Sequence, residues 1–317
     1  MGWETPNMDH LIRSEIWSQE LKDVLLDDLQ GMGYVKWMSE FPDGDTFTIP
    51  SIGQMSVRDY SENSPIQYDK MDTGEFQFSI TEYLSSATYI TDKAKQDSFY
   101  MSQLVSSFIP KQRRAIEEKI ETDIFKSGEP GSAGGQTAND LNLINGAAHR
   151  FVGSGTNEVM APADFAKAKF ALKKANVPHS NLIAIVDPSV GYQLETSSNL
   201  VDVSNNPRWE GIIETGITTG MRFVRNVYGF DVYESNYLAD ANETINAVTT
   251  TAGKANLFFS ADQSVLPFIG AWRQMPKVDS EYNKDFQREE YVTTCRYGLK
   301  LYRPENLVTI LTDTDQV

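Results

Sequence analysis

Few side chains in this chain have the type and spacing that enzymatic chemistry requires. His10, His149 and His179 are far apart, and no cysteine or carboxylate accompanies them at the spacing of a metal site. No Gly-x-Ser-x-Gly motif supplies a serine nucleophile. The single cysteine, Cys295, lies in the strand-like run YVTTCRYG, where a buried and unreactive thiol is expected.

Two further stretches have the composition of a ligand loop without its full motif. Residues 127–137 (SGEPGSAGGQT) are rich in glycine, but no Gly-Lys-Ser/Thr follows, and Gly153 and Gly155 complete no dinucleotide fingerprint. Asp43 and Asp45 predict a hairpin turn, because the other ligand positions of a calcium loop are missing. The sequence therefore predicts no catalytic, cofactor-binding or metal-binding residue, and a cofactor-free hydrolase remains as an alternative.

Composition and charge narrow the class of protein. The chain has 317 residues, of which 40% are hydrophobic and 11% aromatic, so about two domains with ordinary cores can form. Its net charge of −16 argues against binding to nucleic acid, and we identify no cluster of lysine and arginine that would neutralise phosphates. One cysteine forms no internal disulfide, no apolar run approaches the roughly 18 residues of a membrane helix, and the N-terminus MGWETPNMDH lacks the pattern of a secretory signal. We expect a reducing, cytoplasm-like compartment.

The element that organises the rest of the chain is a long helix expected over residues 91–125. Its apolar residues recur mostly in steps of three and four, at 101, 104, 105, 108, 109, 116, 120, 124 and 125. Pro110 lies inside this pattern and lacks a backbone N–H, so we expect a kink near Ser107 or a new helix starting at Pro110. An ordinary core helix is the alternative, but a helix of this length usually spans two parts of a molecule.

The segments before this helix differ from one another in character. Residues 8–30 predict a helix with one apolar face, and the first sixty residues contain eleven acidic and four basic side chains. The acidic face is either solvated or belongs to an arm on a neighbouring subunit. Strands are predicted at 46–49, 54–59, 76–80 and 87–90, and the polar stretch 56–73 has too few aliphatic residues to hold itself, so it should pack on a partner.

The segments after the long helix alternate between helices and strands. Helices are predicted at 161–176 and 190–195, and residues 182–186 (LIAIV) predict a fully buried strand because no polar residue interrupts them. Residues 200–217 are loop-rich. Further strands are predicted at 221–227, 229–234, 255–260 and 265–269, with two more within 287–310. This order predicts an α+β fold.

Several motifs, taken in order, resemble a known family. IWSQEL, then GDTFTIPSIG, then TYITDKAKQD leading into the long helix, and finally CRYGLKLYRPENLV together resemble the major capsid proteins of tailed bacteriophages, over nearly the whole chain. The resemblance implies the Hong Kong 97 (HK97-like) capsid fold. It assigns residues 1–33 to an N-terminal arm, 34–90 to an extended β loop, 91–180 to a peripheral domain with the long spine helix, 181–275 to an axial domain, and 276–317 to a return into the peripheral domain.

The same resemblance implies a structural function. Such a chain self-assembles, as hexamers and pentamers, into an icosahedral head shell that encloses double-stranded DNA without sequence-specific binding. It has no enzymatic activity, cofactor or membrane contact, is made in the host cytoplasm and ends in the virion. Scaffolding, portal and decoration proteins are candidate partners, and no scaffold-like segment precedes the arm. The alternatives are an encapsulin-like nanocompartment shell and a cytosolic α+β enzyme.

Some relatives in this family join their subunits covalently. Their isopeptide bond links a lysine of the extended loop to an asparagine of the peripheral domain, assisted by a glutamate. Lys70 is the only lysine between Met38 and Thr91, and the acceptor position falls near Gln287, with Asn283 four residues away. A glutamine would not present its amide at the same point, and misplacement by about 1 Å can cost roughly a hundredfold in rate. We therefore predict a shell held by non-covalent contacts.

Overall fold

The computed structural model describes residues 29–38, 46–52, 57–63, 65–66, 68, 73–97, 101–196 and 223–314. Four of the sequence predictions therefore lie wholly or mainly outside the described residues. These are the helix at 8–30, the turn at Asp43 and Asp45, the isopeptide donor Lys70 and the loop-rich stretch 200–217.

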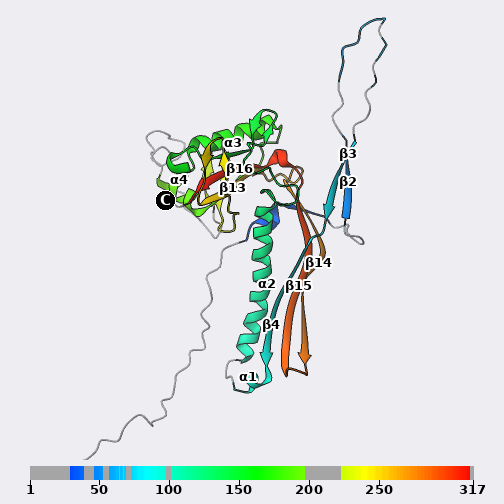
Figure 1. Cartoon of the computed structure of the whole chain (residues 1–317), viewed down its shortest axis with the longest axis vertical. Helices are drawn as coiled ribbons and strands as arrows, with labels where there is room; N and C mark the ends of the chain where they lie inside the picture. The colour runs from blue at the N-terminus through cyan, green and yellow to red at the C-terminus, as the bar shows by residue number, and fades with distance from the viewer. Residues whose placement is uncertain are drawn as a thin grey trace, which may run out of the picture.

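A six-stranded sheet forms one half of the molecule, on the left in Figure 1. Its spatial order is β7 (Arg150–Val152), β16 (Val308–Asp313), β13 (Gly253–Ser260), β8 (Leu182–Val186), β10 (Phe230–Glu234) and β9 (Phe223–Val227). The β16–β7 and β10–β8 pairs are parallel, and the others are antiparallel. The buried strand predicted at 182–186 is confirmed, since all five residues of β8 are buried.

Helices cover both faces of this sheet. On one face, α3 (Pro162–Lys174) and α4 (Pro188–Thr196) pack Phe165, Leu172 and Val190 against side chains that include Ala184 and Val186. On the other face, the alternate residues Ile183 and Ile185 pack with Ile116, Ile120 and Ile124 of the long helix. Because neither face of β8 meets water, the strand contains no polar residue.

The long helix is α2 (Met101–Lys126), and the shorter α1 (Asp92–Asp97) precedes it. The helix predicted over 91–125 is thus described as two helices, with 98–100 outside the described residues. α2 continues through Pro110, so no new helix starts there; Pro110 is exposed. The C-terminal half of α2 lies where the two large sheets meet, because its buried residues also pack on Phe268 and Tyr297 of the second sheet.

The second sheet is long and has four strands beside α2 (Figure 1). Its order is β1 (Val35–Met38), β14 (Phe268–Asn283), β15 (Arg288–Leu301) and β4 (Glu82–Thr91). The prediction of a short strand at 265–269 was wrong, because β14 continues to Asn283 through Pro276. A register shift between Gln274 and Lys277 accommodates this proline, which cannot donate a ladder hydrogen bond.

A two-stranded hairpin of β2 (Thr46–Ile52) and β3 (Thr73–Ser79) projects away from both sheets (Figure 1). The strand predicted at 54–59 is not found in its described part, since residues 57–59 have no regular structure. The stretch between β2 and β3 carries exposed apolar side chains: Val57 is 98% exposed, Tyr68 90% and Tyr60 75%. At its base the hairpin packs on the four-stranded sheet through the buried side chain of Phe78. Beyond that base its connecting stretch leaves apolar side chains uncovered, and a two-stranded hairpin without further packing is marginal in water.

Short elements lie between these helices and strands. They are η2 (Gly31–Tyr34), β5 (Leu143–Ile144), β6 (Ala147–Ala148), η3 (Thr156–Glu158), β11 (Thr244–Ile245), β12 (Val248–Thr249) and η6 (Pro304–Asn306). The two large sheets draw strands from several parts of the chain. β7 and β16 belong to the six-stranded sheet, whereas the first half of β14 belongs to the four-stranded sheet.

Candidate assembly site

The N-terminal segment is attached to the body of the molecule at a buried carboxylate of α2. Glu121, which is 0% exposed, accepts the backbone N–H of Gln30 at 2.7 Å and that of Gly31 at 2.7 and 2.8 Å. A Cβ at Gly31 would lie only 2.8 Å from the Glu121 carboxylate, so this close approach requires glycine. Burial, helped by the charges of Tyr233 and Glu121, raises the pKa of neighbouring Tyr34 to about 12.

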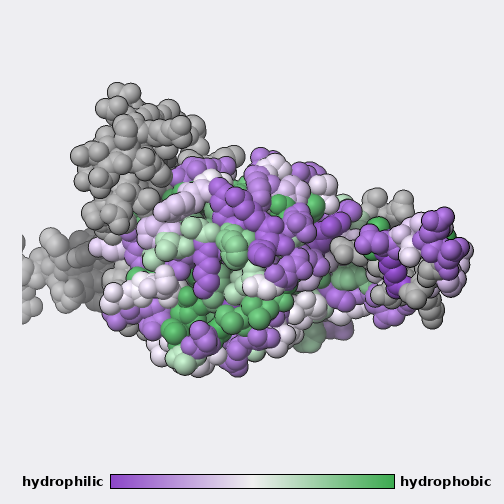
Figure 2. Space-filling view, turned by 90° about the horizontal axis from the view of Figure 1, so that it is seen from above, coloured by the Kyte–Doolittle hydropathy of each residue, from purple (hydrophilic) through white to green (hydrophobic). Residues whose placement is uncertain are grey.

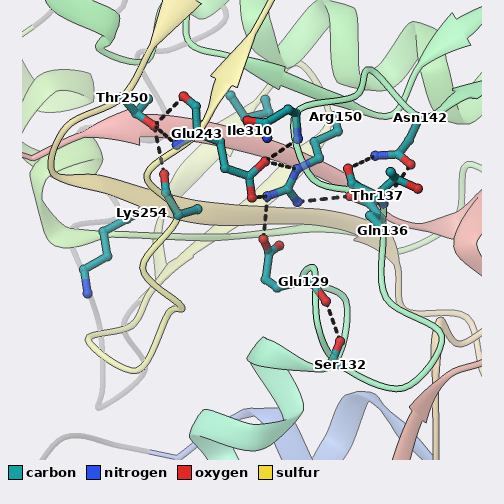
Figure 3. A network of polar contacts seen from close by, with 12 residues as sticks. Glu129, Ser132, Gln136, Thr137, Asn142, Arg150, Glu243, Thr250, Lys254 and Ile310 are labelled. Carbon is teal, nitrogen blue, oxygen red and sulfur yellow. Dashed lines mark hydrogen bonds and ion pairs between the residues drawn. The ribbon is translucent and has the colours of Figure 1, made fainter.

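A second buried polar cluster, here called the Arg150 network, joins the loop after α2 to the six-stranded sheet (Figure 3). Arg150 begins β7 and is 0% exposed. Its Nη2 donates to Glu129 Oε2 at 2.7 Å and to Glu243 Oε1 at 2.9 Å, and its Nη1 donates to Gln136 Oε1 at 3.4 Å. Glu129 and Gln136 follow α2, whereas Glu243 precedes β11, so one guanidinium connects three segments.

This network contains one cation and two carboxylates. Burial raises the pKa of Glu129, although the charge and hydrogen bond of Arg150 oppose the rise. Burial acts to lower the pKa of Arg150, but the two glutamates outweigh it and leave that pKa raised. The sequence gives no local signal of this cluster, because Arg150 lies in a mainly apolar run and its ion-pair partners are 21 and 93 residues away.

Polar contacts also fix α1 to the far end of the β14–β15 hairpin. The Tyr282 hydroxyl donates to Asp92 Oδ2 at 2.6 Å, and Lys95 Nζ lies 2.6 Å from Glu289 Oε2. The backbone N–H of Asp92 donates to the carbonyl of Gln287 at 3.0 Å. The start of the helical segment and the turn of the long hairpin therefore form one structural unit.

The two residues considered as isopeptide acceptors differ in their surroundings. Asn283 Nδ2 donates to Glu290 Oε1 at 3.1 Å, and the same oxygen accepts from Arg288 Nε at 2.6 Å. Gln287 is an exposed turn residue with a φ of +47°. Asn283 is thus an amide beside a carboxylate, and its side chain is already engaged within the subunit.

The predicted burial of Cys295 is confirmed: it lies in β15 with 0% exposure, and burial raises the pKa of its thiol. His149 is also buried, which lowers its pKa, and its Nδ1 lies 3.1 Å from the carbonyl of Ala147. Within the described ranges, no three His, Cys, Asp or Glu side chains gather as metal ligands would. None of the described helices combines the length and apolar character needed to cross a membrane.

The two sheets, the long helix at their junction and the projecting hairpin define a shell subunit of the HK97-like fold. The structure of Mycobacterium phage Che8 matches with a TM-score of 0.70 and 17% identity over 95% of this chain and 97% of that chain. The bacteriophage PhiM1 mature capsid matches with a TM-score of 0.68 and 12% identity over 99% and 96%. The cyanophage Pam1 capsid matches with a TM-score of 0.68 and 13% identity over 99% of this chain and 100% of that chain.

The sequence itself identifies the family. A family model described as phage capsid protein matches residues 75–310, and the chain belongs to this family. It is a major capsid protein, the structural subunit of a phage head, and the nanocompartment and enzyme alternatives are not favoured. A search of curated proteins finds no match. At these identities the solved structures establish the fold, whereas the family match establishes the capsid class.

Proposed function

We propose that this chain forms the hexamers and pentamers of an icosahedral head that encloses double-stranded DNA, and that it acts by assembly without catalysis. The observation that carries the proposal is the projecting β2–β3 hairpin (Figure 1). Its connecting stretch exposes Val57, Tyr60, Ile66 and Tyr68. Exposed apolar side chains on a marginal hairpin are stabilised when a neighbouring subunit covers them.

The arrangement of the sheets supports a revised division into domains. Residues 1–33 form the arm, and the β2–β3 hairpin is the extended loop. The peripheral domain contains α1, α2 and the four-stranded sheet. The axial domain contains the six-stranded sheet with α3 and α4, and therefore includes β7 and β16, which precede and follow residues 181–275 in the sequence. Scaffolding, portal and decoration proteins are its proposed partners, with synthesis in the host cytoplasm before incorporation into virions.

Electron cryomicroscopy of the purified chain tests this function directly. Closed shells are expected, and monomers or small oligomers under every assembly condition would contradict the proposal. The double variant Val57→Ser, Tyr68→Ser should remain folded and assemble poorly, because these side chains contribute little to the subunit itself. Glu62→Ser, an exposed polar position in the same stretch, is the matched control and should assemble normally.

A further inference from the structure

The outer face of α3 is basic, although the chain as a whole carries a charge of −16. The single acidic side chain of α3, Asp164, is buried and accepts the backbone N–H groups of Ser154 and Ala161 at 2.9 Å. The other polar side chains of the helix are four lysines, which together with Phe170 we call the basic face: Lys167, Lys169, Lys173 and Lys174. This cluster is not evident in the sequence, because apolar residues separate the lysines.

The lysines of the basic face have no carboxylate partner within the described residues. Lys167 Nζ lies 3.8 Å from the centroid of the Phe151 ring, and Lys169 Nζ donates to the carbonyl of Tyr228 at 2.7 Å. On α2, by contrast, Arg113 and Arg114 each pair with a glutamate four residues further on. α3 therefore carries positive charge that no carboxylate among the described residues neutralises.

A nearby histidine responds to the positive charge of the basic face, and exposed aromatic side chains lie beside the lysines. The pKa of His179 is lowered by burial and then by Lys173 and Lys169, which repel its protonated form. Phe170 is 53% exposed among the lysines, and Tyr228, beside Lys169, is 52% exposed. Viewed from the side on which α3 lies, hydrophobic residues are exposed among hydrophilic ones (Figure 2). A matching ligand carries both carboxylates and apolar side chains.

The N-terminal segment of this chain has that chemistry. Residues 1–28 contain seven acidic and two basic side chains, together with Leu21, Val24 and Leu25. We propose that the basic face of one subunit binds residues 1–28 of a neighbouring copy, an inference that rests on the shell function proposed above. Duplex DNA fits less well, because the chain is strongly acidic and an exposed phenylalanine has no partner on a phosphate backbone.

The attachment of the segment favours a neighbouring subunit over the same one. Gln30 and Gly31 are held by Glu121 of α2, which packs on one face of the six-stranded sheet. α3 covers the opposite face. A segment that binds within its own subunit would have to pass around the sheet, whereas a shell supplies other copies at high local concentration, so weak individual contacts suffice.

Cross-linking of assembled particles tests the proposal. Particles are assembled from equal amounts of ¹⁴N- and ¹⁵N-labelled subunits and treated with a carbodiimide, which joins an amine and a carboxylate in contact. If the contact joins neighbouring subunits, about half of the cross-linked peptides that join Lys173 or Lys174 to residues 1–28 should contain one light and one heavy partner, as random mixing of equal pools requires. Only same-isotope pairs, or no pair between α3 and residues 1–28, would overturn the proposal. Absence of particles would instead count against the shell function.

Binding of a labelled peptide of residues 1–28 to the full chain gives a second readout. The double variant Lys173→Gln, Lys174→Gln should bind the peptide roughly 2- to 30-fold more weakly, which corresponds to the usual strength of two exposed ion pairs. Phe170→Ser should weaken it by roughly 4- to 13-fold, from burial of the exposed half of its ring. The matched controls are Lys93→Gln, Lys284→Gln and Phe286→Ser, all exposed positions away from α3. Equal losses in the controls, or binding of duplex DNA but not of the peptide, would refute the assignment.

Discussion

Replacement of Arg150 by methionine is the most direct test of how the two halves of the subunit are held together. The Arg150 side chain is 0% exposed, and its partners Glu129 and Glu243 are only 5% and 12% exposed. The substitution keeps an unbranched side chain but leaves two carboxylates beside each other without a cation. Breaking a buried pair in this way costs about 3–5 kcal/mol, a large part of the roughly 5–15 kcal/mol that stabilises a typical domain.

Two further variants separate charge from packing. In Arg150→Met, Glu129→Gln, Glu243→Gln no buried charge remains, so the triple variant should regain most of the lost stability. Arg113→Met removes an arginine of α2 that is 70% exposed and paired with Glu117, and should cost about 0.5 kcal/mol or less.

Denaturant unfolding of unassembled subunits measures these differences. The single variant should be least stable at neutral pH and should recover towards acid pH, where its two carboxylates become protonated. A loss below about 1 kcal/mol, or a triple variant as unstable as the single one, would refute this account of the Arg150 network.

Four further predictions concern the arm, the extended loop, covalent linkage and pH. Deletion of residues 1–28 should leave cooperative melting intact and impair assembly, and loss of cooperative melting would show that the arm belongs to the core. Amide hydrogens of residues 57–68 should exchange rapidly in free subunits and slowly in particles; strong protection in a verified monomer would contradict this. Denaturing electrophoresis of mature particles should show no covalent multimers, whereas a ladder absent from Lys70→Ala would make Asn283 or Gln287 the acceptor. The pKa of Glu129 is raised in the folded subunit, so its contribution to the free energy of unfolding is full below the ordinary glutamate pKa. That contribution is lost as the pH rises through the pKa of folded Glu129. Unfolding experiments on Glu129→Gln should therefore show a stability that no longer changes with pH for this reason.

Elements whose residues share one environment were predictable from the sequence. β8 has two covered faces and α3 has one, so the uninterrupted apolar run and the three-to-four spacing were reliable signals. The later half of β14 was missed because its residues, from Gln274 to Asn283, are mostly polar, mostly exposed and interrupted by Pro276. There, pairing with β15 determines the strand, and a local pattern does not report a partner strand.

The polar sites were harder to predict for a related reason. Glu121, Arg150 and Glu129 appear in the sequence as ordinary charged residues, and Glu121 falls among other charges of an apparently solvated helix surface. Their burial depends on backbone and side chains 21 to 93 residues away. The sequence therefore identified the capsid fold through motifs and element order, whereas the contacts that connect its parts required the structure.

The position of β16 has a consequence for the synthesis of the subunit. β16 is the last described strand along the chain, yet it lies inside the six-stranded sheet, between β7 and β13. While the ribosome is still translating, β7 and β13 lack the strand that joins them, and their unpaired edges are open to incorrect partners. Pairings between residues so distant in sequence also form slowly. A nascent chain therefore lacks a complete six-stranded sheet until residue 313 has emerged, and a prematurely terminated copy never forms it.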